Sequence, residues 1–330
     1  MKKTTPFALT LCGALSAALS AALCAAPAFA QEGEALLEAS LSAAAATPAW
    51  MSTEVGDAWA KGYKGKGVTI TVVDDFRSNS MLNGKLGTSS QRLRHGQWTA
   101  MEASMIAPLA TVATQDFSSG TAVKLNKGLN VLNLSYGMMA TAGYTASQIR
   151  WSAQENSIIT YARNGTAVIS KAAGNDGIAV LGKNARGQTD YLNLALKGTK
   201  TAIYVGALNT NGTTAAPATL ASYSNTAGTD AAIQNQFVVV GVEGHKTGLY
   251  GTSFAAPVIT GYAAVLGSKF TSATPVQITN QLLSTARQDT IKGYNVQLHG
   301  RGEASLTRAL APVSLRSGVA ASDPKLSSGR

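Results

Sequence analysis

Cysteine is almost absent from this sequence. The 330 residues include 2 cysteines, Cys12 and Cys24, and both lie in the first 30 residues, a segment that we expect to be removed. A mature chain without thiols excludes disulfide bridges, cysteine catalysis and thiolate metal sites. Its stability must therefore come from packing alone.

Charge is also scarce. Only 13% of the residues are charged, and 27 Lys and Arg against 17 Asp and Glu give a formal net charge of +10. No run of basic residues forms the clustered stripe that nucleic-acid binding needs, so we expect no nucleic-acid partner. Apolar residues make up 45% of the chain, which excludes disorder over most of its length.

The first 30 residues have the three parts of a secretory signal peptide. Lys2 and Lys3 precede a soft apolar stretch over 7–23, and Ala28-Phe29-Ala30 offers small residues at a cleavage site before Gln31. A retained membrane anchor is the alternative, but Ala, Ser and Gly dilute the hydrophobicity of the stretch. We therefore predict a bacterial protein that is secreted, periplasmic or on the cell surface, with no membrane span in the mature chain.

The rest of the chain is predicted to contain one α/β domain. Residues 31–49 form a lead-in, 50–311 the folded domain and 312–330 a Ser/Gly/Pro-containing flexible tail. Buried strands are predicted at 68–73, 130–134, 167–170, 202–205 and 237–240. Helices are predicted at 98–106, 146–163 and 275–287. This alternation predicts a doubly wound, mostly parallel sheet with helices on both faces and a site at the carboxyl edge of the strands.

Histidine is nearly as rare as cysteine. His95, His245 and His299 are the 3 present. A hydrolase that forms a covalent intermediate needs a base that titrates near neutrality, so one of these three would have to serve. A histidine considered alone is more often structural, so the surrounding motifs must decide.

The most informative segment is Gly251-Thr252-Ser253-Phe254-Ala255-Ala256-Pro257. An Ala-rich helix is predicted to follow it as far as about Leu266. A hydroxyl at a helix N-terminus lies where free N–H groups and the helix dipole favour developing negative charge. The alternative is that Ser253 is only a helix N-cap.

This segment resembles the nucleophile motif of the subtilisin-like serine peptidases, the subtilases. Four further blocks resemble the family in the same order. They are Val72-Val73-Asp74-Asp75 after Gly65-Lys66-Gly67-Val68, Arg94-His95-Gly96, Asn133-Leu134-Ser135-Tyr136-Gly137 and Ala172-Ala173-Gly174-Asn175. The chain order Asp, His, Ser is that of subtilisin. The resemblance covers roughly residues 50–311 and implies the subtilisin-like fold.

The resemblance also implies roles for individual residues. Ser253 would be the nucleophile, His95 the general base and Asp74 the residue that orients the imidazole. Asn175 and the backbone N–H of Ser253 would form the oxyanion hole. Substrate-binding residues would be Ser135, Tyr136, Gly137, Ala172, Ala173 and Gly174. No metal and no cofactor is expected, and Lys171 and Asp176 are interpreted as residues of the groove rim.

Several features depart from the family pattern. Asp75 and Phe76 stand where Ser or Thr and then Gly usually follow the acidic residue, and Gln97 follows His95-Gly96 where Thr is common. We favour Asp74 over Asp75 because the triad Asp has a fixed place at the strand end. The short spacing from Asp74 to Ser135 indicates that the loop carrying the family's strongest calcium site is deleted. The short lead-in leaves no room for a folding prodomain, as in bacterial secreted or autotransporter-type subtilases.

Three hypotheses about the function remain open. The first is an exported, monomeric serine endopeptidase that acts on polypeptides. The second is a catalytically impaired peptide-binding or surface module on the same fold, because the bulk of Phe76 and Gln97 near the triad could misplace the carboxylate. The third is the sedolisin branch, with Glu102 as a catalytic residue, which leaves His95 and Asn175 unexplained. The floor of the specificity pocket is expected within 178–200.

Overall fold

A computed structural model describes residues 47–315. A six-stranded sheet in the order β10-β9-β7-β5-β1-β4 forms its centre, and all its neighbouring strands are parallel. The strands are β1 (Val68–Asp74), β4 (Thr111–Asp116), β5 (Leu129–Leu134), β7 (Val168–Ala172), β9 (Ala202–Leu208) and β10 (Phe237–Gly241). Each of the five predicted strands is present. The edge strand β4 was not predicted, since most of its residues are exposed or half-buried and it lacks the apolar run of the other strands.

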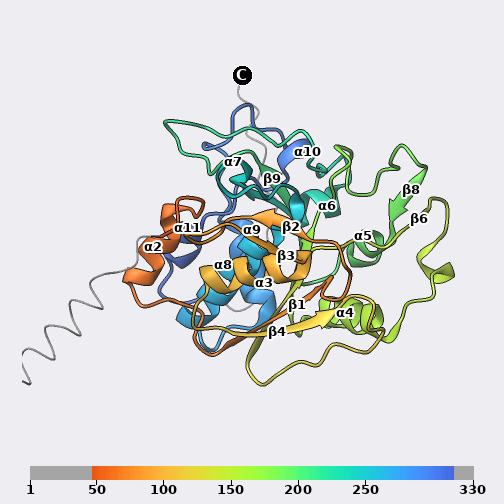
Figure 1. Cartoon of the computed structure of the whole chain (residues 1–330), viewed down its shortest axis with the longest axis horizontal. Coiled ribbons are helices and arrows are strands. Elements are labelled where there is room, and N and C mark those ends of the chain that lie inside the picture. The colour runs from red at the N-terminus through yellow and green to blue at the C-terminus, as the bar shows by residue number, and fades with distance from the viewer. Residues whose placement is uncertain (1–46, 316–330) are drawn as a thin grey trace, which may run out of the picture. The chain divides into compact units, whose positions relative to one another are not determined.

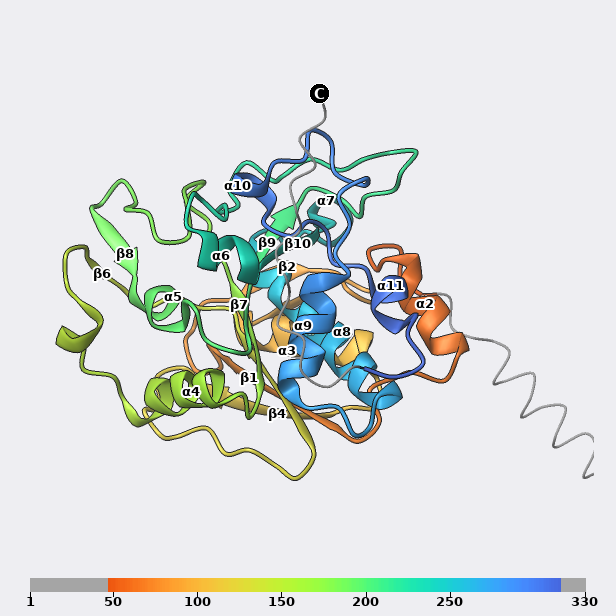
Figure 2. The ribbon, with the colours of Figure 1, turned by 180° about the vertical axis from the view of Figure 1, so that it is seen from behind.

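Alternation along the strands divides the interior into two cores. On one face Ile70 and Val131 pack in a core with residues of α2 (Thr53–Ala60), α3 (His95–Ile106), α8 (Ala256–Lys269), α9 (Pro275–Ser284) and α11 (Leu306–Leu310). On the other face Val73 and Leu132 pack with α4 (Ala153–Asn164), α5 (Tyr191–Leu196) and α6 (Ala231–Gln236). Figures 1 and 2 show α3, α8 and α9 together in the middle of the molecule and α4 and α5 together at one side of it. The doubly wound, mostly parallel α/β fold is confirmed.

Smaller elements complete the structure. Two antiparallel pairs join β2 (Leu82–Gly84) with β3 (Gln91–Leu93) and β6 (Met139–Thr141) with β8 (Gln188–Asp190). The short helices are η1 (Ala146–Gln148), α7 (Gly244–Thr247), η2 (Thr252–Phe254) and α10 (Val296–His299).

The predicted helix over 146–163 is wrong at its start. After η1 the chain is not helical again until α4, where the Ser152 hydroxyl accepts a hydrogen bond from the Gln154 N–H as N-cap. Gly165 ends α4 with a φ of 77°, as a left-handed C-cap. The capping box of Thr274 and Gln277 does open α9, which ends at Ser284 rather than near residue 287.

The predicted signal peptide (1–30), most of the lead-in (31–49) and most of the tail (312–330) lie outside the described residues. Within 47–315, no helix has both the length and the apolar character needed to cross a membrane.

Candidate active site

The centre of the candidate site lies at the carboxyl end of β1. Asp74 is the last residue of this strand and is 1% exposed. Its Oδ1 lies 2.6 Å from Nδ1 of His95 and also accepts the N–H of Asp75 at 2.6 Å. Its Oδ2 accepts the hydroxyl of Thr99 at 2.9 Å. Because a carboxylate only accepts hydrogen bonds, it favours the imidazole tautomer that carries its proton on Nδ1 and leaves Nε2 free as a base.

The residues that depart from the family pattern fit around this pair. Phe76 packs against Gly96, where an added Cβ would lie 2.8 Å from Cζ of the Phe76 ring and 2.7 Å from the Asp75 carbonyl oxygen. The ring therefore occupies space that the glycine leaves empty, and Asp74 keeps its contact with His95. Gln97 accepts the N–H of Arg94 at 2.9 Å and so closes the first turn of α3.

Ser253 lies in η2, directly before α8. The ring of Phe254 lies 5.6 Å from the ring of His95, which places the serine segment beside the imidazole. The Ser253 hydroxyl donates to the carbonyl oxygen of Ser135 at 3.2 Å, and no hydrogen bond joins it to His95 in the described structure. The N-cap of α8 is Ala255 and that of η2 is Gly251, so the alternative that Ser253 is an N-cap does not hold.

Two hydrogen bonds fix the amide of Asn175. Its Oδ1 accepts the N–H of Thr252 at 2.7 Å and the hydroxyl of Thr252 at 3.0 Å. A backbone N–H can only donate, so the amide oxygen must face Thr252 and the amide nitrogen must face the other way. Within residues 47–315, neither Nδ2 of Asn175 nor the N–H of Ser253 is engaged in a hydrogen bond. Two free donors therefore flank the serine.

The serine segment is also tied to the sheet. The Ser135 hydroxyl, at the end of β5, donates to the carbonyl oxygen of Ser253 at 2.9 Å and accepts from Asn133 at 3.0 Å. The hydroxyl of Ser170 in β7 donates to the carbonyl oxygen of Ala256 at 2.8 Å. The position of Ser253 is thus set by two central strands.

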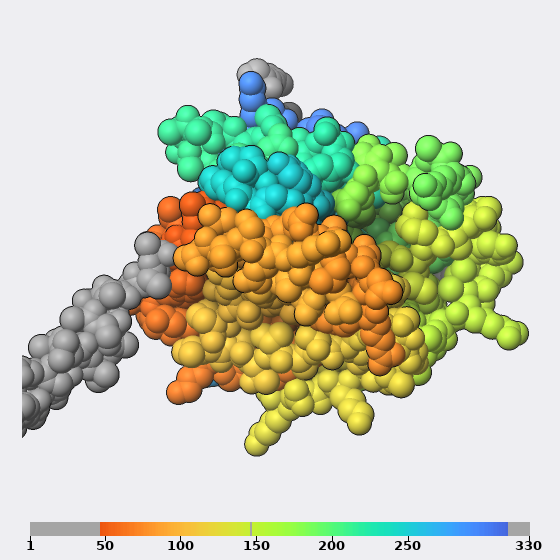
Figure 3. Space-filling model, in the orientation of Figure 1, coloured from red at the N-terminus to blue at the C-terminus, as the bar shows by residue number. Residues whose placement is uncertain are grey.

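A pocket of about 320 Å³ opens next to Ser253. Figure 3 shows the surface hollowed between the orange segment around β2 and β3 and the green segments around β6 and β8. The pocket lining includes Ser253, Asn175 and the six residues proposed from the sequence to bind substrate, Ser135, Tyr136, Gly137, Ala172, Ala173 and Gly174. Seven further residues come from the segment 178–190, within the range where the pocket floor was expected: Ile178, Val180, Gly182, Asn184, Arg186, Gln188 and Asp190.

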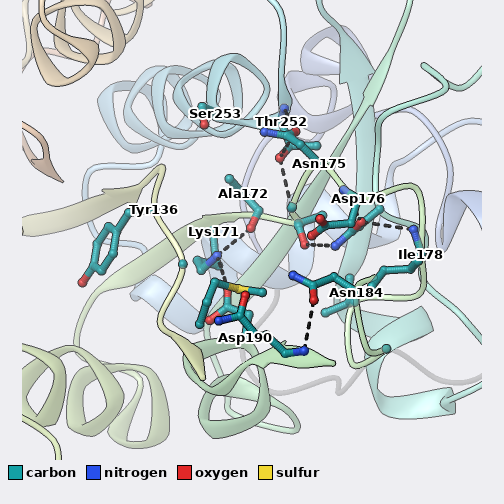
Figure 4. Close-up of a pocket in the computed structure, with 18 of the residues that line it drawn as sticks. Tyr136, Lys171, Ala172, Asn175, Asp176, Ile178, Asn184, Asp190, Thr252 and Ser253 are labelled. Carbon is teal, nitrogen blue, oxygen red and sulfur yellow. Dashed lines mark hydrogen bonds and ion pairs between the residues drawn. The ribbon is translucent and has the colours of Figure 1, made fainter. Parts of the chain in front are cut away.

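Lys171 does not lie on the rim of the groove, where it was predicted from the sequence. It is 1% exposed, in β7, and not on a rim, and its ammonium forms an ion pair of 3.0 Å with Asp190. Asp176, by contrast, is exposed in the pocket lining. Figure 4 shows the Lys171–Asp190 pair on the side of the pocket away from Ser253. Asp190 was not singled out from the sequence. The predicted strand ended at Ser170, and the structure extends it through Lys171 to Ala172, so that the lysine is buried and needs an acidic partner.

Glu102 is a further buried carboxyl group, on the helix that begins with His95. It lies about two turns after His95 on α3. Its Oε2 has no hydrogen-bond partner within the described residues, and burial raises the pKa of this carboxyl group well above its usual value. Asp74 instead bonds to His95 and Thr99. No group of three or more His, Cys, Asp or Glu side chains arranged to hold a metal ion occurs in residues 47–315.

Comparisons with known proteins agree with this geometry. The sequence profile of the subtilase family matches residues 83–303. This chain belongs to the subtilase family. The match begins after Asp74 and includes His95 and Ser253.

Two solved structures have a similar fold. A lanthipeptide protease is 16% identical, with a TM-score of 0.55, and the alignment covers 80% of this chain and 93% of the other. MycP1 from the ESX-1 type VII secretion system is 20% identical, with a TM-score of 0.51, and the alignment covers 78% and 83%. The search of curated protein sequences gave no significant match. Membership of this family supports a serine protease function.

Proposed function

We propose that this subtilase is an exported serine endopeptidase that cleaves polypeptides through Asp74, His95 and Ser253. The observation that carries the proposal is the 2.6 Å contact between Asp74 and His95, with the serine segment packed against the same imidazole. A carboxylate in this position orients the ring and stabilises the imidazolium that forms when the base takes a proton. The sedolisin alternative would need Glu102 to act with the acidic residue, but Asp74 bonds to His95 and Thr99.

The reaction would proceed through an acyl-enzyme. Nε2 of His95 removes the Ser253 proton while Oγ forms a bond to the scissile carbonyl carbon. The oxyanion of the tetrahedral intermediate accepts hydrogen bonds from Asn175 Nδ2 and the Ser253 N–H, the two free donors beside the serine. The carbon–nitrogen bond then breaks, and His95 returns the proton to the leaving amine. Water attacks the acyl group in a second, equivalent cycle and frees Ser253.

Before attack the hydroxyl must change partner. It rests on the Ser135 carbonyl oxygen, whereas proton transfer requires a hydrogen bond to His95. A rotation about one side-chain torsion is the smallest movement that changes the direction of a serine hydroxyl, and staggered rotamers make three such positions available. Catalytic hydrogen bonds are often absent or long without substrate and form in the complex.

The same observation favours a second candidate function. If the hydroxyl stays on Ser135, the protein is a peptide-binding module on the subtilase fold and its pocket binds without turnover. A fluorophosphonate probe separates the two, because it reacts only with a serine activated by a base. We expect one label per chain on Ser253, identified by peptide mass mapping, and no label in the His95→Ala variant.

The matched control is His245→Ala, because His245 has a half-exposed side chain paired with Glu243 and lies outside the candidate site. This variant should be labelled at the wild-type rate. Absence of label on the wild-type protein would reject the endopeptidase, and labelling that survives His95→Ala would reject His95 as the base.

Export is a separate part of the proposal. Residues 1–30 have the composition and cleavage site of a secretory signal peptide. We expect the protein recovered from outside the cytoplasm of a bacterial host to begin at Gln31, as determined by N-terminal sequencing. An intact N-terminus on a protein confined to the cytoplasm would reject export.

A further inference from the structure

The Lys171–Asp190 pair is a buried, charged feature of the pocket that the proposed chemistry does not use. Both side chains are buried, with 1% and 8% of their surface exposed, and both line the pocket. Burying two charges is costly unless their hydrogen bonds are satisfied. Counting the hydrogen bonds that the two side chains make within the protein therefore shows which donors and acceptors remain for a ligand.

Most of these bonds are made within the protein. Nζ of Lys171 donates to Oδ2 of Asp190 at 3.0 Å and to the Ala172 carbonyl oxygen at 2.7 Å. Oδ1 of Asp190 accepts the N–H groups of Met138 at 2.9 Å and Leu192 at 3.0 Å. An ammonium group has three N–H donors, and each carboxylate oxygen accepts about two hydrogen bonds. Within residues 47–315 one donor of Lys171 and one acceptor position on Asp190 Oδ2 are thus left over.

Gly137 keeps the free side of Asp190 open. An added Cβ on Gly137 would lie 2.8 Å from Asp190 Oδ2. The chain therefore passes close to this oxygen without a side chain to cover it. The walls around the pair include Met139, Ile178 and Val180, which suit the methylene groups of a long side chain.

One free donor next to one free acceptor matches a carboxamide. The amide oxygen can accept from Lys171 while the amide NH₂ donates to Asp190. A lysine or arginine in the same place meets the Lys171 ammonium, and a glutamate or aspartate meets the Asp190 carboxylate. An apolar side chain displaces water and leaves both groups unsatisfied. The pair is neutral as a whole, so it offers no net compensation to a buried ligand charge.

We propose that the Lys171–Asp190 pair makes this pocket select a carboxamide side chain, glutamine before asparagine, at the residue on the amino side of the cleaved bond. The proposal rests on the proposed function, because it takes the pocket beside Ser253 to be the place where that side chain is bound. Glutamine is favoured because the pair lies away from Ser253, with the Ala172 carbonyl between them in Figure 4. The longer side chain reaches the pair with both polar atoms.

The first test is a set of peptides that differ only at this residue, with Gln, Asn, Glu, Lys or Leu. We expect kcat/KM for Gln to exceed that for Glu, Lys and Leu by about 10-fold or more, as one or two well-placed hydrogen bonds allow. A preference for Leu, Lys or Glu over Gln would overturn the proposal.

Charge-changing variants test whether the pair is responsible. Lys171→Met leaves Asp190 without its cation and should move the preference toward Lys and Arg. Asp190→Asn leaves the ammonium and should move it toward Glu. Lys183→Met is the matched control, since Lys183 is an exposed lysine of the same segment outside the pocket lining, and it should keep the wild-type preference.

A single variant of a buried pair can fail to fold, so a double variant completes the set. Lys171→Met with Asp190→Leu removes both charges but leaves the N–H groups of Met138 and Leu192 without their acceptor, so its folding is checked by circular dichroism. The folded double variant should prefer Leu and Met. If this double variant or both single variants retain the preference for Gln, the pair does not select the side chain.

A binding measurement separates this inference from the proposed function. Product peptides that end in Gln, Glu, Lys or Leu are titrated calorimetrically into Ser253→Ala, which cannot turn over. We expect the peptide ending in Gln to bind most tightly, by about 10-fold. Failure of fluorophosphonate labelling with this binding order intact would reject the peptidase and keep the pocket selectivity. The reverse result would keep the peptidase and reject the selectivity.

Discussion

Two acid–base pairs stand at the carboxyl ends of parallel strands, and their surroundings differ. Asp74 is sealed, but its partner His95 has 26% of its side chain exposed and a ring nitrogen that bonds to nothing within the described structure. Lys171 and Asp190 are both sealed, with 1% and 9% of their side chains exposed. Under the proposed function the first pair would exchange a proton with a substrate, whereas the second pair would act as a fixed dipole that shapes the pocket. If both proposals hold, exposure of one partner, more than charge, separates the reactive pair, Asp74–His95, from the recognition pair, Lys171–Asp190.

The largest expected effect comes from breaking the reactive pair. Asp74→Asn should lower kcat by about 10⁴-fold, because the amide favours the wrong imidazole tautomer. Asp75→Asn is the matched control, since the Asp75 carboxylate is bonded to Ser78 and not to His95. Hydrolysis of a chromogenic peptide measures both. If Asp75→Asn were the more damaging change, the assignment of the acid to Asp74 would be wrong.

Breaking the sealed pair should affect stability instead. Lys171→Met should lower the free energy of unfolding by about 3–5 kcal/mol, because it leaves a buried carboxylate without its partner. Lys197→Met breaks the ion pair with Asp230, whose side chains are 37% and 34% exposed, and should cost less than about 1 kcal/mol. Urea unfolding followed by circular dichroism compares the two. Equal losses would contradict the distinction between sealed and exposed pairs.

The free side-chain N–H donor of Asn175 should affect kcat and not substrate binding. Asn175→Ala should lower kcat by about 10²–10³-fold with little change in KM, because the oxyanion exists only after attack. Asn209→Ala is the control, as Asn209 is exposed and bonds to Thr219. A rise in KM without a fall in kcat would mean that Asn175 binds substrate and does not stabilise the oxyanion.

The smallest expected effect is that of the unpaired carboxyl group of Glu102. Burial raises its pKa in the folded protein, so the fold favours the protonated form. Stability from this group is complete below the pKa of the unfolded chain, near 4.5, and is lost as the pH rises toward the folded value. Glu102→Gln should therefore have nearly the stability of the wild type at pH 4 and be more stable than the wild type at pH 7.5.

The control for this change is Asp57→Asn at an exposed position of α2, which should show no such pH-dependent gain. Thermal unfolding at both pH values measures the difference. A Glu102→Gln variant that is equally destabilised at both pH values would show that the carboxyl group is not protonated in the fold.

Features that are specified by a short stretch of sequence could be predicted, whereas features that depend on contacts between distant segments could not. The serine segment and the strand runs are local patterns, so the parallel sheet and the blocks around His95, Asn175 and Ser253 could be recognised residue by residue. The partner of Lys171 is set by the path of a loop that returns from β7 to β8, and no local pattern specifies such a path. Ending the third strand at Ser170 placed Lys171 outside it, whereas alternation within β7 turns this side chain toward the pocket. The rest position of the Ser253 hydroxyl depends on one torsion, which no motif encodes.

The hydrogen bonds of Thr252 join two segments that are far apart in the sequence. Its N–H and hydroxyl both hold Asn175, and the same hydroxyl accepts the N–H of Gly174 at 3.0 Å. Two stretches of chain that are 77 positions apart are thus joined directly to each other next to Ser253. Insertions, deletions and drift in the intervening chain can change the shape of the molecule while the dimensions of this corner stay the same. Divergent relatives can in this way keep the same arrangement of residues at this corner while they act on different substrates.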